Sequence, residues 1–112
     1  MLKTAIKAAK LAGRIIETNF EKIKEVNTKN SDNELFTNID IECENTIIKT
    51  IKDKFPDHNI WSEECGNLKK TKSNYEWIID PLDGTNNYVA NIPFVGVSIG
   101  VMYKKQSYLG VV

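Results

Sequence analysis

The sequence predicts an α+β fold in which two N-terminal helices pack on one face of a mainly antiparallel sheet. Two observations lead to this prediction. Apolar residues recur at helical spacing up to residue 55, and apolar residues alternate at strand spacing after residue 93. A chain of 112 residues is long enough for one domain with a buried core. The helices and the sheet are therefore expected to share a single core.

The first predicted helix covers residues 2–26, because apolar residues recur there at intervals of three and four along one helix face. The residues assigned to that face are Leu2, Ile6, Ala9, Ala12, Ile16, Phe20 and Ile23. The next segment, 27–36, is polar and rich in turn-forming residues, so it is predicted as a loop.

A second helix is predicted to begin near Thr37, because Thr37 and Asp40 have the spacing of a capping box. The apolar residues assigned to its buried stripe are Ile41, Ile48, Ile51 and Phe55. Pro56 is expected to end this helix, since proline cannot continue the helical hydrogen bonding.

The rest of the chain is predicted to form strands. Their expected ranges are 59–62, 76–79, 94–103 and 108–112. The strand at 76–79 is expected to stop at Asp80-Pro81, because proline cannot donate to a sheet ladder. Segment 67–74 reads as a solvated link, and 104–107 reads as a hairpin turn.

The charge balance is neutral, with 15 basic and 15 acidic residues. This balance argues against nucleic acid as a substrate and against binding to a membrane surface. The apolar runs are far shorter than the roughly 20 residues that a membrane helix needs. The N-terminus does not have the pattern of a secretory signal, so a cytoplasmic location is expected.

Cysteine and histidine chemistry is not expected to carry the function. Cys43 and Cys65 do not form a C-x-x-C pair and are predicted to be reduced thiols. His58 is the single histidine, which argues against a histidine-based zinc site. It lies in a turn-like segment and is interpreted as a surface residue rather than as part of a Ser-His-Asp triad.

The most informative segment for function is DPLDGT at residues 80–85. Asp80 and Asp83 follow a buried strand, and two carboxylates at a strand end can hold a hard cation. The backbone N–H groups from Gly84 to Asn86 would face the same point and can hold a phosphate. Glu63 and Glu64 follow another short predicted strand. Taken alone, two adjacent acids of this kind are more typical of a solvated loop.

The same residues resemble the inositol monophosphatase family, whose signature is D-P-[IL]-D-G-T. Residues 62–64 resemble the family's G-E-E segment, with Ser62 in place of glycine. Lys29 and residues 35–40 resemble the family's lysine loop and the T-x-x-D start of its second helix. Further matches follow in order at residues 87–88, 93–94 and 97–100. The resemblance covers nearly the whole chain.

The resemblance implies a Mg²⁺-dependent phosphate monoester hydrolase that acts through a metal-activated water. Its substrate would be inositol monophosphate or a similar sugar phosphate. By similarity, Glu63, Asp80 and the backbone carbonyl of Leu82 bind the first Mg²⁺, and Asp80 and Asp83 share a second. The complete protein is expected to be a homodimer.

The resemblance also assigns the phosphate contacts and the catalytic residues. Phosphate would be contacted by residues 82–85, which include Leu82, Asp83, Gly84 and Thr85, and by Lys29. Asp40 and Thr85 would orient and deprotonate the attacking water, with Glu63 as the third catalytic residue.

The sequence departs from the family in one large respect. The family takes a further metal-binding aspartate and its inositol contacts from a C-terminal half that contains a W-D motif, and neither occurs here. Residues 1–112 are therefore interpreted as the N-terminal metal- and phosphate-binding portion of an inositol-monophosphatase-like domain, equivalent to the first part of the layered αβαβα sugar-phosphatase fold. This portion alone is expected to be a poor phosphatase.

Alternative functions were weighed against the same motif. A haloacid-dehalogenase-type phosphatase needs a nucleophilic aspartate where this chain has Pro81, which argues against it. A 3′(2′),5′-bisphosphate nucleotidase tends to have Lys-Glu after the motif, where this chain has Asn86 and Asn87. That nucleotidase, a fructose-1,6-bisphosphatase of the same superfamily and a catalytically inactive truncated remnant remain open.

Overall fold

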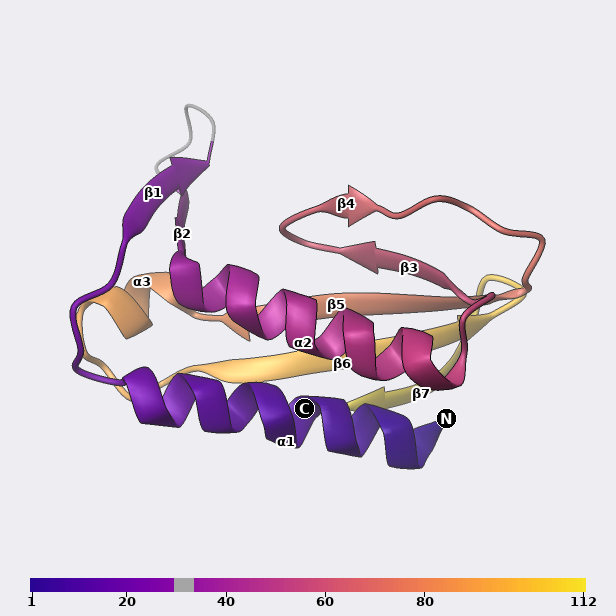
Figure 1. Cartoon of the computed structure of the whole chain (residues 1–112), viewed down its shortest axis with the longest axis horizontal. Helices are drawn as coiled ribbons and strands as arrows, with labels where there is room; N and C mark the ends of the chain where they lie inside the picture. The colour runs from indigo at the N-terminus through magenta and orange to yellow at the C-terminus, as the bar shows by residue number, and fades with distance from the viewer. Residues whose placement is uncertain (30–33) are drawn as a thin grey trace.

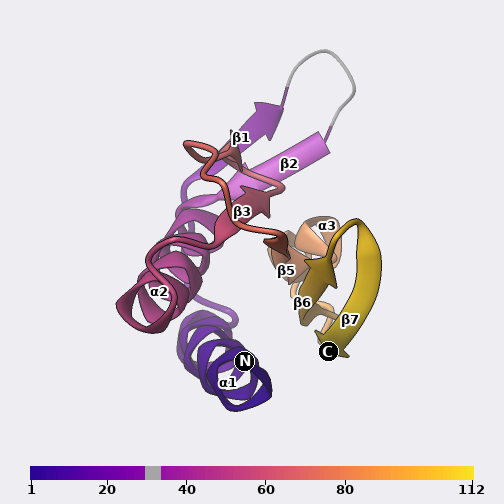
Figure 2. The same cartoon turned by 90° about the vertical axis from the view of Figure 1, so that its right-hand side faces the viewer.

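Two long helices cover one face of a sheet, as Figure 1 shows. This computed structural model describes residues 1–29 and 34–112. Helices α1 (Leu2–Asn19) and α2 (Asn38–Lys54) lie alongside each other, and Figure 2 places both on the same side of the strands. Within the described residues, no helix is both long enough and apolar enough to cross a membrane.

The main sheet has five strands in the order β4-β3-β5-β6-β7. Their bounds are β3 (Asn59–Ser62), β4 (Gly66–Asn67), β5 (Tyr75–Asp83), β6 (Gly96–Tyr103) and β7 (Gln106–Val111). The β3–β5 pair is parallel, and the other three neighbouring pairs are antiparallel. The predicted α+β fold, with two helices on a mainly antiparallel sheet, is therefore confirmed.

The region between the two helices differs from the prediction. Helix α1 ends at Asn19 instead of residue 26, because Phe20 is extended and Glu21 has a positive φ of 62°. Strands β1 (Val26–Lys29) and β2 (Glu34–Thr37) then pair antiparallel, where a loop was predicted at 27–36. Residues 30–33 of that loop prediction lie outside the described residues. Ile23, assigned to the buried helix face, is fully exposed.

Backbone pairing explains why this helix does not continue. The Glu25 N–H donates to Oδ1 of Asn38 at 3.0 Å, and the Asn38 N–H donates to the Glu25 carbonyl at 3.2 Å. These bonds extend the β1–β2 hairpin to the start of α2. Satisfying these backbone groups against another segment outweighs the apolar periodicity that continued past Asn19.

The buried faces of the helices are rotated relative to the predicted stripes. Helix α1 buries Ala5, Ala8, Ala12 and Ile16, and α2 buries Ile39, Cys43, Ile47 and Ile51. Leu2, Ile6 and Ile41, all assigned to the core, are exposed by 52%, 38% and 37%. The small alanine side chains turn toward α2 and the sheet, because they let the two helix backbones approach closely.

The sheet positions the functional residues through a distortion in β5. This strand does not stop at Asp80 as predicted but continues to Asp83, with a shift of register between Asp80, which pairs with Ser98, and Asp83, which pairs with Gly96. Pro81 is buried inside this bulge, where no ladder hydrogen bond is required of it. A central strand therefore contains a proline and still reaches both aspartates.

Two smaller features also differ from the prediction, and a third agrees with it. The β6–β7 hairpin turns at Lys104 and Lys105 alone, both with positive φ, so β7 begins at residue 106 instead of 108. The short strand β4 begins just before the segment predicted as a link at 67–74. Cys43 and Cys65 are both free, in agreement with the prediction.

His58 is not a plain surface residue. Its ring stacks between Phe55 and Tyr75, with ring centroids 4.8 and 4.7 Å away, and its Nδ1 accepts a hydrogen bond from Trp77 Nε1 at 3.0 Å. Burial, followed by the charge of nearby Lys52, lowers the pKa of His58 and favours the neutral ring. His58 thus fastens the end of α2 to β5.

Candidate metal and phosphate site

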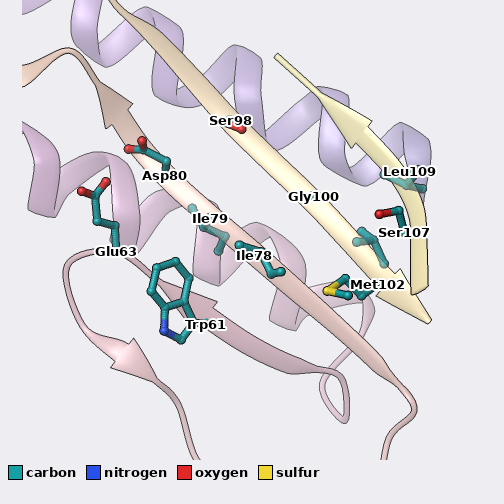
Figure 3. A pocket seen from close by; sticks show the side chains of 11 residues that line it. Trp61, Glu63, Ile78, Ile79, Asp80, Ser98, Gly100, Met102, Ser107 and Leu109 are labelled. Carbon is teal, nitrogen blue, oxygen red and sulfur yellow. The ribbon is translucent and has the colours of Figure 1, made fainter. Parts of the chain in front are cut away.

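Two acidic residues meet because β3 and β5 run parallel. Parallel strands end at the same edge of a sheet, so the residues that follow them become neighbours. The Glu63 N–H continues this pairing and donates to the Ile79 carbonyl at 3.0 Å. Figure 3 shows the carboxylates of Glu63 and Asp80 beside each other at this edge. The topology thus brings together two acids that are 17 positions apart (80 − 63) in the sequence.

The environment of Asp80 favours a positive partner. Burial raises the pKa of Asp80 to about 7, and a hydrogen bond with Glu63 and the negative charges of Glu63 and Asp83 act in the same direction. Its Oδ1 is buried without a hydrogen-bond partner. A buried carboxylate oxygen without a partner, next to two further carboxylates, fits a hard cation that takes oxygen ligands.

The three predicted metal carboxylates are near one another without forming a finished site. Within residues 1–29 and 34–112, no three side chains of His, Cys, Asp or Glu are close enough together to hold a metal ion as they stand. Glu63 and Asp80 are neighbours, whereas Asp83 is exposed at the end of β5. A cation would therefore have to draw the Asp83 carboxylate toward the other two.

Asp40 and Thr85 are brought together from positions 45 residues apart. The Thr85 hydroxyl donates to Oδ1 of Asp40 at 2.8 Å. The other oxygen of Asp40 accepts from the Thr37 N–H at 2.9 Å and from the Thr37 hydroxyl at 2.5 Å, which completes the predicted capping box. Asp40 is fully buried, so it can reach a water molecule in the site only through Thr85.

Lys29 lies at the site but contacts carboxylates. Its Nζ is 2.6 Å from Oε1 of Glu64 and 3.6 Å from Oε1 of Glu63. Burial alone would lower the pKa of Lys29, but the hydrogen bond to Glu64 and the charges of both glutamates outweigh it and raise the pKa. The Glu64 side chain is only 4% exposed, and this burial raises its own pKa despite the nearby cation. The short contact identifies Lys29–Glu64 as a real ion pair, which the sequence did not predict.

The phosphate-binding residues assigned by resemblance surround a pocket of about 220 Å³. It is lined by Lys29, Glu34, Leu35, Glu63, Asp80, Leu82, Asp83, Gly84, Thr85 and Asn86. Helix α3 (Thr85–Val89) begins at this pocket, directly after Gly84. Of the predicted site residues, only Asp40 lies outside the lining, behind Thr85.

Gly84 lets the backbone pass close to Phe94 and Val95, the two residues before β6. Its φ of 89° is left-handed, and a Cβ at this position would lie 2.8 Å from the carbonyl oxygen of Phe94. No other residue can adopt this conformation in the same space without strain. This steric requirement explains why the residue between Asp83 and Thr85 is a glycine.

A second cavity, of about 430 Å³, adjoins the acidic residues on the sheet face opposite the helices. Figure 3 shows Trp61, Ile78 and Met102 along it, with Glu63 and Asp80 at one end. The acidic site therefore lies at the boundary between a charged pocket and a largely apolar surface.

Residues 1–112 match the inositol monophosphatase family along their whole length. The chain belongs to this family. It is 42% identical to "Nus factor SuhB" of Pasteurella multocida and 44% identical to "Inositol monophosphatase 3" of Solanum lycopersicum, over 100% and 99% of its own length. In both comparisons the chain spans 42% of the relative. The match therefore covers less than half of these relatives.

Solved structures of the family have the same fold. The IMPase of Thermotoga maritima superimposes with a TM-score of 0.88 at 32% identity, over 98% of this chain and 42% of that one. An IMPase/NADP phosphatase, solved as a complex with Mg²⁺ and phosphate, has a TM-score of 0.74 at 27% identity, over 90% of this chain and 38% of that one. These structural similarities show that the chain has the fold of the family's phosphatases.

Proposed function

We propose that this chain supplies the Mg²⁺- and phosphate-binding portion of a phosphate monoester hydrolase. The observation that carries the proposal is the unpartnered buried oxygen of Asp80, flanked by Glu63 and Asp83 at the edge of a phosphate-sized pocket. The substrate proposed is inositol monophosphate or a similar sugar phosphate. The related phosphatase solved with Mg²⁺ and phosphate supports the metal and phosphate part of this proposal.

The metal ligands proposed are the carboxylates of Glu63, Asp80 and Asp83 together with the Leu82 carbonyl. All are oxygen donors, as Mg²⁺ prefers. Bound Mg²⁺ would neutralise charge on the phosphoryl oxygens and lower the pKa of a water molecule. The backbone N–H groups from Gly84 to Asn86, together with Lys29, are proposed to hold the phosphate.

Thr85 is proposed to orient the attacking water. Its hydroxyl has one proton, which it donates to Asp40 at 2.8 Å, so the lone pairs of its oxygen can accept a hydrogen bond from water. Asp40 holds this orientation from its buried position. When the water loses a proton to the Thr85 oxygen, the proton of the Thr85 hydroxyl can pass to the Asp40 carboxylate, which becomes neutral. Glu63, at the same edge, is proposed as the other residue that contacts the water.

Calorimetry with the Asp83→Asn variant tests the metal site. This change removes one negative charge but keeps the shape of the side chain, so we expect Mg²⁺ affinity to fall at least about tenfold. Asp57→Asn is the matched control, because Asp57 is an exposed carboxylate outside the pocket. The parent affinity is expected to be weak, since Mg²⁺ gives up its waters reluctantly. Equal affinities in the parent and Asp83→Asn would refute the assignment.

A phosphatase screen tests the substrate. Inositol monophosphate, fructose 1,6-bisphosphate and adenosine 3′,5′-bisphosphate should be compared with and without Mg²⁺, using this chain and any longer protein that contains it. A solved relative named as both an inositol monophosphatase and a fructose 1,6-bisphosphatase, 26% identical to this chain, keeps the second substrate in the comparison. Hydrolysis that is independent of Mg²⁺ would argue against the proposed mechanism.

A second candidate function is suggested by the names of several relatives. "Nus factor SuhB" proteins of Pasteurella multocida and Escherichia coli are 42% and 40% identical to this chain. A Nus-factor role without catalysis would survive Asp83→Asn. A longer protein containing this chain should therefore be tested, with and without that substitution, for replacement of SuhB in Escherichia coli. Replacement by both forms would favour the second function.

A further inference from the structure

The turn that carries Glu63 is held from three sides. From the sheet, a carbonyl of β5 accepts the Glu63 N–H at 3.0 Å. From the β1–β2 hairpin, Lys29 forms its 2.6 Å ion pair with Glu64. From α2, Oε1 of Glu44 accepts the Cys65 N–H at 3.0 Å. Three consecutive residues between β3 and β4 are thus each fastened to a different element.

Glu44 is a buried carboxylate with no other assigned role. The residue is only 4% exposed, although it lies on a helix and belongs to a residue type that is rarely buried. Burying a carboxylate is costly unless it accepts hydrogen bonds. The Cys65 N–H supplies such a bond, 21 residues away in the sequence. Helix α2 therefore places this acid against the turn and away from solvent.

The position of Glu44 on α2 matches that of Asp40. The two residues are four apart, so their side chains emerge on the same helix face, one turn from each other. Asp40 accepts a hydrogen bond from Thr85, and Glu44 accepts one from the backbone of the Glu63 turn. The same helix face thus supports both halves of the proposed site.

We propose that Glu44 is a positioning residue for the metal site. By accepting the Cys65 N–H, it holds the turn so that the Glu63 carboxylate stays beside Asp80. This inference rests on the proposed function, because the role of Glu63 as a ligand belongs to that proposal. Partners that orient metal ligands from behind contribute about 10- to 100-fold to metal affinity in other proteins.

Three substitutions test the proposal. Glu44→Leu removes the acceptor, Glu44→Gln keeps an acceptor oxygen, and Glu42→Leu removes an exposed glutamate from the same helix. Two measurements apply to each variant: hydrogen exchange of the amides at residues 63–65 without metal, and Mg²⁺ affinity by calorimetry. Melting temperatures identify variants that have simply lost stability.

We expect Glu44→Leu to lose protection at the Cys65 amide and to bind Mg²⁺ about tenfold more weakly. Glu44→Gln should retain both properties, because its amide oxygen can still accept the Cys65 N–H. Glu42→Leu should behave as the parent chain does. Rescue by glutamine separates a hydrogen-bonding role from a general effect of mutating the helix. If Glu44→Leu does not fold, Glu44→Ala takes its place.

Two results would overturn the inference: parental Mg²⁺ affinity in folded Glu44→Leu, or a loss in Glu44→Gln as large as in Glu44→Leu. A parent chain that binds no Mg²⁺ would instead overturn the proposed function. The exchange measurements would then still decide whether Glu44 holds the turn, since they are made without metal. Failure of the inference and failure of the proposed function are therefore distinguishable.

Discussion

At the scale of single residues, Asp80 links the proposed metal site to stability. Its pKa is about 7 in the fold against an ordinary value of 3.8, so between these values the folded chain binds more protons than the unfolded chain. The contribution of Asp80 to the free energy of unfolding is therefore present at low pH and is lost as the pH rises through about 7. The acidic cluster thus destabilises the metal-free fold at neutral pH.

Asp80→Asn should remove this penalty. In metal-free buffer at pH 8 we expect the variant to have a higher denaturation midpoint than the parent, because no buried negative charge forms. Urea denaturation of both proteins from pH 4 to pH 8 measures the difference, and Asp57→Asn should follow the parent. Added Mg²⁺ should stabilise the parent and not the variant. Identical pH profiles for the parent and Asp80→Asn would contradict the prediction.

Gly84 gives a second prediction at the residue scale. Gly84→Ala should destabilise the fold by more than about 1 kcal/mol, because its φ is positive and a Cβ would meet the Phe94 carbonyl oxygen at 2.8 Å. Gly110→Ala is the control, since nothing lies within 4 Å of a Cβ at that position. Urea denaturation of the two variants checks this, and equal midpoints would show that the close approach is unimportant.

At the scale of elements, the start of α2 connects helix stability to the site. Thr37 caps this helix through its side chain, while its own N–H and hydroxyl both bond to Asp40, which in turn accepts the bond from Thr85. The residues that begin the helix thus also orient Asp40 and Thr85, the proposed catalytic pair. A change in the cap should affect both.

Thr37→Ala should therefore cost about 1 kcal/mol of stability, the usual value of a lost N-cap. Thr37→Ser should retain most of it, because the serine hydroxyl can make the same bonds. Thermal or urea unfolding of the two variants gives the comparison. Serine and alanine variants of equal stability would mean that the hydroxyl contributes nothing at this position.

At the scale of the whole molecule, the chain spans 42% of the length of the curated relatives that it matches. By the resemblance to the family, a further metal carboxylate and the sugar contacts would come from a C-terminal half that these 112 residues do not include. Positioning dominates phosphoryl transfer. A substrate held by its phosphate alone should therefore react slowly.

We expect the 112-residue chain alone to hydrolyse inositol monophosphate at a rate at least about 100-fold below that of a full-length relative. "Inositol monophosphatase 3" of Solanum lycopersicum, measured with Mg²⁺ under the same conditions, is a suitable reference. Mg²⁺ binding with turnover reduced by at least about this factor is the result expected for the isolated chain. Turnover equal to that of the reference would show that residues 1–112 contain all the residues that matter.

The sequence by itself was sufficient for the fold class and for the carboxylate motif. Alternation in 94–103 predicts the strand that buries Val97, Ile99 and Val101, because strand periodicity depends only on local spacing. The capping box at Thr37 is local in the same way, since its two partners are three residues apart. Features of this kind can be read from neighbouring residues.

Only the tertiary structure decided which distant groups meet. The end of α1, the β1–β2 hairpin and the Lys29–Glu64 ion pair depend on contacts between segments far apart in the sequence, and no local pattern encodes them. The parallel β3–β5 pair brings Glu63 to Asp80, and burial together with that neighbour raises the pKa of Asp80 to about 7. Charge, burial and unsatisfied hydrogen bonding are properties of the assembled site, because each depends on what the fold places around a residue.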